Sequence, residues 1–181
     1  MNGEDLKQYC EEARTRGATA VKLIHPSTVV TASWVRWKCQ FGCAAYGKSF
    51  CCPPNTPVPD ETRKLLDAYR RAILFHIEAP RTPERGKQFM EFFEMLLALE
   101  GDLFKDGYYK ALVMLAGPCH LCKECGKTKG NGSCNFGGKA RPSMEACGID
   151  VFQTARNHGF FIQTLREKKE TQNIFSLLLV D

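Results

Sequence analysis

The hydrophobic and polar positions follow patterns that predict a mixture of helices and strands. Apolar residues at helical spacing before Gly17 predict a short first helix. Runs of β-branched and other apolar residues predict strands over 19–24, 28–37, 71–77, 110–116 and 174–180. Caps and helical periodicity predict further helices over 60–69, 82–101 and 150–159. Because strands and helices alternate, the pattern favours an α/β fold, in which helices flank a mixed layered sheet.

The length and composition set the size of this fold. The chain has 181 residues, 44% of them hydrophobic, which predicts a single α/β domain over 1–181 with cysteine-rich loops at 37–59 and 117–147. The polar, acidic start of the sequence is not that of a signal peptide. Acidic residues interrupt the apolar stretch 89–99, which is shorter than the roughly 20 residues that span a bilayer. We therefore expect a cytoplasmic protein without a membrane segment.

Ten cysteines change the functional prediction. Cytosolic thiols are kept reduced, so a cysteine-rich chain without a secretory signal indicates metal or redox chemistry rather than disulfides. The net charge of +5 is modest, and lysines gather near the second cysteine group. This basic stretch is either a solvated loop or a source of cations that balance an anionic metal–thiolate centre, whereas a nucleic-acid interface needs a broader basic face.

The denser cysteine group follows the predicted strand 110–116. Its spacing is C-x2-C-x2-C-x8-C, formed by Cys119, Cys122, Cys125 and Cys134. Three thiolates at such short intervals, closed by a fourth, are typical of loops that hold a [4Fe–4S] cluster. Zinc is the alternative, although zinc sites are normally assembled from two separated ligand pairs. The residues therefore favour an iron–sulfur centre at the end of a strand, where open α/β sheets place ligands.

A second group consists of Cys39, Cys43 and the adjacent pair Cys51 and Cys52. Neighbouring side chains of an extended segment point to opposite sides, so Cys51 and Cys52 are not expected to bind the same metal. Pro53 restricts the backbone of Cys52, which makes Cys52 the better ligand and leaves Cys51 outside the predicted set. Cys147 either completes the shell as a distant fourth ligand or is a buried apolar residue of the core.

The stretch 141–150 also has two interpretations. Ser143 and Glu145 have the positions of a helix cap and a first-turn acid. That interpretation leaves Arg141 unexplained, so Arg141 could pair with an anionic cluster or substrate. Asp150 is a further helix cap and a weaker site candidate.

Together these motifs resemble an uncharacterised family of predicted metal-binding proteins, the domain of unknown function 2284. The resemblance rests on three stretches: Trp37 to Lys48 with Cys52-Pro53-Pro54, Gly117 to Cys134, and Ala140 to Asp150. It implies metal binding through the seven cysteines Cys39, Cys43, Cys52, Cys119, Cys122, Cys125 and Cys134, without an agreed reaction. The chain departs from the family pattern at Ala44 and Phe136, where proline is frequent.

Three functions remain open at this point. The first is an iron–sulfur protein with two [4Fe–4S] clusters that exchanges electrons with a redox partner protein. The second is an iron–sulfur enzyme, a reductase or sulfur-handling lyase, that binds a small-molecule substrate at an open iron beside Tyr46 or Lys48. The third is a zinc-stabilised interaction module. No nucleotide-binding or hydrolase motif identifies a substrate or a catalytic residue.

Overall fold

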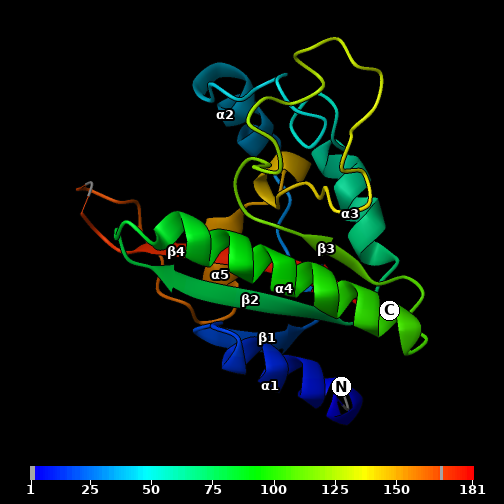
Figure 1. The fold of residues 1–181 in the computed structure, drawn as a ribbon. Coiled ribbons are helices and arrows are strands. Elements are labelled where there is room, and N and C mark those ends of the chain that lie inside the picture. Colours follow the sequence, from blue (N-terminus) through cyan, green and yellow to red (C-terminus); the bar gives the residue numbers. More distant parts are fainter. Residues whose placement is uncertain (1–2, 168) are drawn as a thin grey trace.

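The core of the molecule is a four-stranded antiparallel sheet (Figure 1). The computed structural model describes residues 3–167 and 169–181. In the sheet order β1-β2-β4-β3, the strands are β1 (Ala20–Ile24), β2 (Ala72–Ala79), β4 (Gln172–Leu179) and β3 (Leu112–Met114). The predicted mixed α/β class is confirmed, and the strand predictions near these four segments are confirmed with shifted ends.

Helices cover both faces of this sheet (Figure 1). The α-helices are α1 (Lys7–Thr15), α2 (Ser33–Gly42), α3 (Pro59–Asp67), α4 (Arg85–Lys105) and α5 (Val151–Asn157). Three short 3-10 helices accompany them: η1 (Glu4–Leu6), η2 (Pro26–Thr28) and η3 (Glu145–Cys147). Helices α1 and α4 pack on one face, whereas α3, η3 and α5 pack on the other.

Alternating side chains of the two central strands supply two hydrophobic cores. In β2, Ile73 and Phe75 join the core beneath α1 and α4, while Leu74 joins the core beneath α3 and α5. Side chains alternate across a strand, so a strand that is covered on both faces is apolar at nearly every position. This explains why the β2 sequence lacks the polar alternation of a half-exposed strand.

Helix α4 is longer than the sequence predicted. Gly101 was expected to end it, but the helix continues to Lys105. Leu99 and Leu103 are both fully buried on the same helix face, so the packing of this last turn outweighs the small cost of an internal glycine. The chain leaves the helix at Gly107, whose φ of 97° favours glycine.

The strand predicted over 28–37 is wrong. The structure has η2 at Pro26–Thr28 and then α2 from Ser33, with one isolated bridge between Thr31 and Ile149. Val35 is the only residue of α2 that the structure buries, while Trp37 and Phe41 are exposed. The β-branched and aromatic residues that suggested a strand therefore lie on a helix. The packing of α2 through Val35 on one side outweighs the strand propensity of these residues.

In the parts of the chain that the structure describes, no helix has the length and apolar character needed to cross a bilayer.

Candidate metal centre

The two cysteine-rich loops meet beyond one end of the sheet, above β3 in Figure 1. The second loop is closed at its base, because Leu115 N–H donates to Pro142 O at 2.9 Å and Met144 N–H donates to Leu115 O at 2.9 Å. Lys127 reaches from this loop to Asn55 Oδ1 of the first loop at 2.9 Å. The loop 117–142 therefore begins and ends at one point and lies against the first loop.

The first loop is anchored through η3. Arg36 of α2 donates to Ala146 O at 2.7 Å, and Thr56 Oγ1 donates to the same oxygen at 2.6 Å. Thr62 of α3 donates to Cys147 O at 2.6 Å. These buried or half-buried bonds fix both ends of the segment that carries Cys43, Cys51 and Cys52.

The adjacent cysteines Cys51 and Cys52 have different chief thiol partners. Cys51 forms a side-chain hydrogen bond with Cys119. Among thiols, Cys52 is influenced most by Cys43, then by Cys39 and least by Cys119. The geometry thus associates Cys51, which the sequence left outside the ligand set, with the group that follows β3.

The four cysteines of the second loop form one interacting group. The pKa of Cys122 is raised by desolvation and then by the neighbouring charges of Cys125, Cys119 and Cys134. All four are partly buried. The four thiols are therefore near enough to influence the charge of Cys122, while ligation by these residues stays a prediction.

Cys119 carries the clearest electrostatic signature. The hydrogen bond from the Cys51 thiol lowers the pKa of Cys119 to about 6, with help from the backbone near Leu121 and the charge of His120 and against the effect of burial. The same contact and burial raise the pKa of Cys51. A thiolate rather than a thiol binds metal, so this shift favours the form of Cys119 that metal ligation would need.

Cys125 is also shifted towards the thiolate. Burial opposes this shift, but hydrogen bonds from the backbone of Lys127 and Phe50 and from the Ser49 side chain lower the pKa of Cys125 overall. Ser49 and Phe50 belong to the first loop. Groups of both loops therefore stabilise the thiolate form of Cys125.

The donor set suits a soft metal centre. All ten cysteines are free thiols, and no disulfide competes for them. Among residues 3–167 and 169–181, no three His, Cys, Asp or Glu side chains converge closely enough to hold a single metal ion. Thiolate ligands suit zinc and iron–sulfur clusters, whereas calcium and magnesium prefer oxygen. The donor type of these residues therefore fits a thiolate-bound centre, while the described residues do not bring three donors to one metal position.

A model of the family described as Predicted metal-binding protein (DUF2284) matches residues 22–180. The chain belongs to this family. The resemblance inferred from the cysteine motifs is thereby confirmed. Comparisons with curated proteins and with solved structures found no match. The family description supports metal binding and names no metal.

Two cysteines of this family member lie in the hydrophobic cores. Cys147 is 1% exposed among apolar residues beneath α3 and α5, and burial raises its pKa to about 12. This packing matches the interpretation of Cys147 as a core residue, and its role as a ligand stays a prediction. Cys10 packs against the other core, and burial raises its pKa as well.

Arg141 has a structural partner that the sequence did not reveal. Its guanidinium pairs with Glu100 of α4, with Nη2 to Oε2 at 2.8 Å. Glu100 is 7% exposed and also accepts the Val113 N–H at 2.9 Å. Arg141 therefore neutralises a buried carboxylate, which accounts for this residue without an anionic cluster or substrate.

The remaining weaker candidates have backbone roles. Asp150 caps α5 by accepting the Gln153 N–H at 2.9 Å, as predicted. Tyr46 and Lys48 lie in consecutive turns after Cys43, where the Tyr46 N–H donates to Cys43 O at 3.1 Å. Within residues 3–167 and 169–181, neither side chain forms a hydrogen bond or ion pair.

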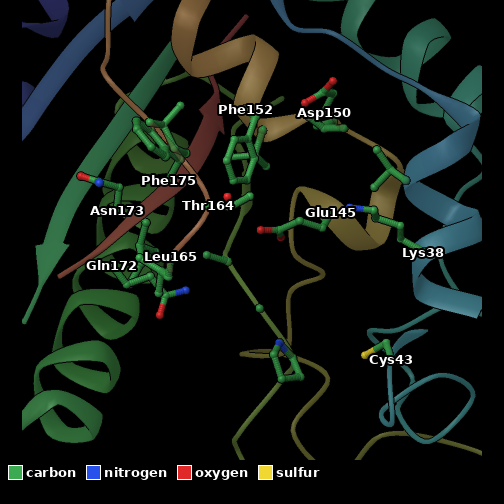
Figure 2. Close-up of a pocket in the computed structure, with 18 of the residues that line it drawn as sticks. Lys38, Cys43, Glu145, Asp150, Phe152, Thr164, Leu165, Gln172, Asn173 and Phe175 are labelled. Carbon is green, nitrogen blue, oxygen red and sulfur yellow. The ribbon is translucent and has the colours of Figure 1, made fainter. Parts of the chain in front are cut away.

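A cavity of about 1070 Å³ lies beside the first cysteine group (Figure 2). Cys39, Cys43 and His120 line one part of it. Figure 2 shows Glu145 pointing into the space between Cys43 and the far wall, where Gln172 and Asn173 lie. Burial raises the pKa of Glu145. The sequence indicated only a first-turn acid at this position, because it does not show which surface that helix faces.

Proposed function

We propose that this chain is an iron–sulfur protein that holds two [4Fe–4S] clusters and uses them in redox chemistry. One observation supports the proposal: Cys51 forms a hydrogen bond with Cys119 of the second group, whereas the thiol with the largest influence on its neighbour Cys52 is Cys43 of the first group. A single segment therefore borders two sulfur-rich groups. The proximity of the groups supports electron exchange between two centres.

The second group would hold one cluster through Cys119, Cys122, Cys125 and Cys134. Four thiolates complete the coordination of a cubane, and a fully coordinated cluster accepts and donates single electrons. The lowered pKa values of Cys119 and Cys125 favour the thiolate form that such ligation needs. A redox partner protein would supply the electrons to this cluster in the cytoplasm, where thiols remain reduced.

The first group supports a second candidate function, that of an iron–sulfur enzyme. Cys39, Cys43 and Cys52 supply three thiolates, and Cys39 and Cys43 line the large cavity. A centre with three protein ligands keeps one position for substrate. The cavity favours binding of a small-molecule substrate at this centre. The cluster of the second group would then supply electrons to it, as in a reductase.

Serine replacement of single cysteines tests the ligand sets. We expect Cys122→Ser to lose one cluster's share of iron, about half of the iron of the wild-type chain. Cys39→Ser should lose the other share, while Cys10→Ser is the matched control because Cys10 packs against the core. The measurement is iron and acid-labile sulfide per chain after anaerobic purification. Equal iron in all three variants would refute the proposal.

Zinc binding is the outcome that would replace this proposal. A zinc-stabilised module would carry zinc and no labile sulfide, and it would lack an electron paramagnetic resonance signal after reduction. Zinc analysis of the same samples separates the two functions.

A further inference from the structure

The cavity beside Cys39 and Cys43 has a largely aromatic wall. Clefts that bind small molecules and cofactors have volumes of about 300–1000 Å³, and this cavity of about 1070 Å³ reaches the upper limit of that range. Stacked and edge-to-face rings attract beyond simple burial, so such a wall suits a flat aromatic body. Its five rings belong to Trp34, Phe89, Phe93, Phe152 and Phe175.

Three cationic side chains also line the cavity, and each lies over one of these rings. A ring attracts a cation but leaves its charge in place. Within residues 3–167 and 169–181, none of the three forms an ion pair with a carboxylate. The pairs are Lys38 with Trp34 at 5.4 Å from the ring centre, Arg85 with Phe89 at 5.8 Å, and Arg156 with Phe152 at 5.7 Å.

Arg85 differs from the other two cations. It is half-buried and, among the described residues, its side chain has no hydrogen bond or ion pair. Its nitrogens nevertheless remain accessible. Lys38 is exposed, and Arg156 is exposed and donates to Ile162 O at 3.2 Å. A half-buried guanidinium with five N–H donors and no acceptor in the chain gains most from an anionic acceptor on a ligand.

The two carboxyl groups of the wall do not supply that acceptor. Asp150 caps α5 by accepting the Gln153 N–H at 2.9 Å, and Arg85 is not paired with it. Glu145 Oε2 is sealed from the cavity, and burial raises the pKa of Glu145, which disfavours its charged form. Because Arg85 is the first residue of α4, it also lies outside both cysteine-rich loops. The anion that suits Arg85 is therefore one that enters the cavity.

We propose that this cavity binds an aromatic carboxylate, whose anionic group pairs with the Arg85 guanidinium and whose ring packs against the aromatic wall. Guanidinium and carboxylate groups match in shape and form two parallel hydrogen bonds. Lys38 and Arg156 add attraction for an anion and repel a cationic ligand. The proposal names the substrate class of the cavity in the proposed function, and it rests on that function only for chemistry at Cys39 and Cys43.

Two naphthalene probes of nearly equal shape and different charge test the proposal. We would titrate 1-naphthylacetate and the neutral 1-naphthylacetamide into the anaerobically purified full chain by calorimetry, and measure iron and acid-labile sulfide in the same sample. The carboxylate should bind about tenfold more tightly than the amide, because hydrogen bonds between charged groups are the stronger kind.

Arg85→Gln should abolish this preference by weakening the carboxylate about tenfold, with little change for the amide. Lys87→Gln is the matched control, because it removes a cation of α4 that is exposed, pairs with Glu91 and does not line the cavity. Since exposed charges are screened, it should leave both affinities within about twofold of the wild type.

A second variant keeps the test decisive if Arg85→Gln fails to fold. A side chain added at Gly86, in the cavity wall, would meet open space, and leucine suits a helix better than glycine. Gly86→Leu should therefore fold and weaken both probes several-fold, and unchanged binding would overturn the proposal.

Equal affinities of the wild type for the two probes, tighter binding of the amide, or no binding of the carboxylate at millimolar concentration would also overturn it. So would a preference that survives in Arg85→Gln. Iron and sulfide are separate readouts. A chain without iron that still shows the Arg85-dependent preference would refute only the proposed function, and an iron-loaded chain without the preference would refute only the ligand class.

Discussion

At the scale of single residues, the pair Cys51 and Cys119 explains how the molecule prepares a thiolate before metal arrives. The thiol of Cys51 donates to Cys119 and stabilises its charged form. Sequence spacing could not show this contact, because the two residues are 68 positions apart and only the folded loops bring them together. Cys51 therefore supports the second group even if it does not bind metal.

Removal of this donor should raise the pKa of Cys119. Because the hydrogen bond with Cys51 lowers the pKa of Cys119, Cys51→Ala should move the titration of Cys119 upward and slow its alkylation at pH 7. Peptide-resolved alkylation of metal-free protein between pH 5 and 9 measures the shift. Cys10→Ala is the control, and an unchanged rate at Cys119 in Cys51→Ala would contradict this account.

Glu145 shows a second feature of a single residue that the sequence does not predict, namely the surroundings of its side chain. The sequence predicted its place near a helix start, and the structure confirms a short helix at Glu145–Cys147. Whether its carboxyl group faces solvent or a cavity depends on α4, α5 and β4, which come from distant parts of the chain. Local patterns carry no information on that packing, so the residue was missed as a candidate site.

At the scale of elements, periodicity predicted β2 and β4 because long apolar runs leave few alternatives. The segment 28–37 was misassigned because its residues favour strands locally, while its burial through Val35 alone suits a helix. Gly101 was expected to end α4 because local propensity does not include the core contact of Leu103. Elements whose type follows from their own hydrophobic pattern were thus predictable. Elements whose type or end depends on tertiary packing were not.

The contact between α4 and the end of the second cysteine loop yields a stability prediction. Arg141→Met leaves Glu100 buried with the Val113 N–H as its remaining donor, which should lower the free energy of unfolding by about 2 kcal/mol. Urea denaturation measures the change. The double variant Glu100→Gln with Arg141→Met should recover most of the loss, since no unpaired charge remains. A loss as large in the double variant would show that packing, and not the charge, is responsible.

At the scale of the whole molecule, the sheet and its two cores form a frame that holds the cysteine loops at one end. Arg71 ties the two ends of the chain to this frame through ion pairs with Asp5, at 2.7 Å, and with Asp181. Hydrogen bonds from Tyr108 and Arg71 lower the pKa of Asp5, and the bond with Arg71 lowers the pKa of Asp181.

These shifts predict how stability depends on pH. A carboxyl group with a lowered pKa in the folded state contributes stability above its unfolded value of 3.8, and this contribution is lost as pH falls through the folded value. Asp5→Asn should therefore lower the free energy of unfolding at pH 7, by less than about 1 kcal/mol because the pair is partly exposed. The difference from the wild type should shrink below pH 4. A difference that grows in acid would contradict the prediction.

The central claim is that the thiols of the two loops hold iron–sulfur clusters. Quantification of iron, acid-labile sulfide and zinc in the anaerobically purified wild-type chain tests it most directly. We expect about eight irons and eight sulfides per chain, with little zinc. Stoichiometric zinc without labile sulfide would contradict it.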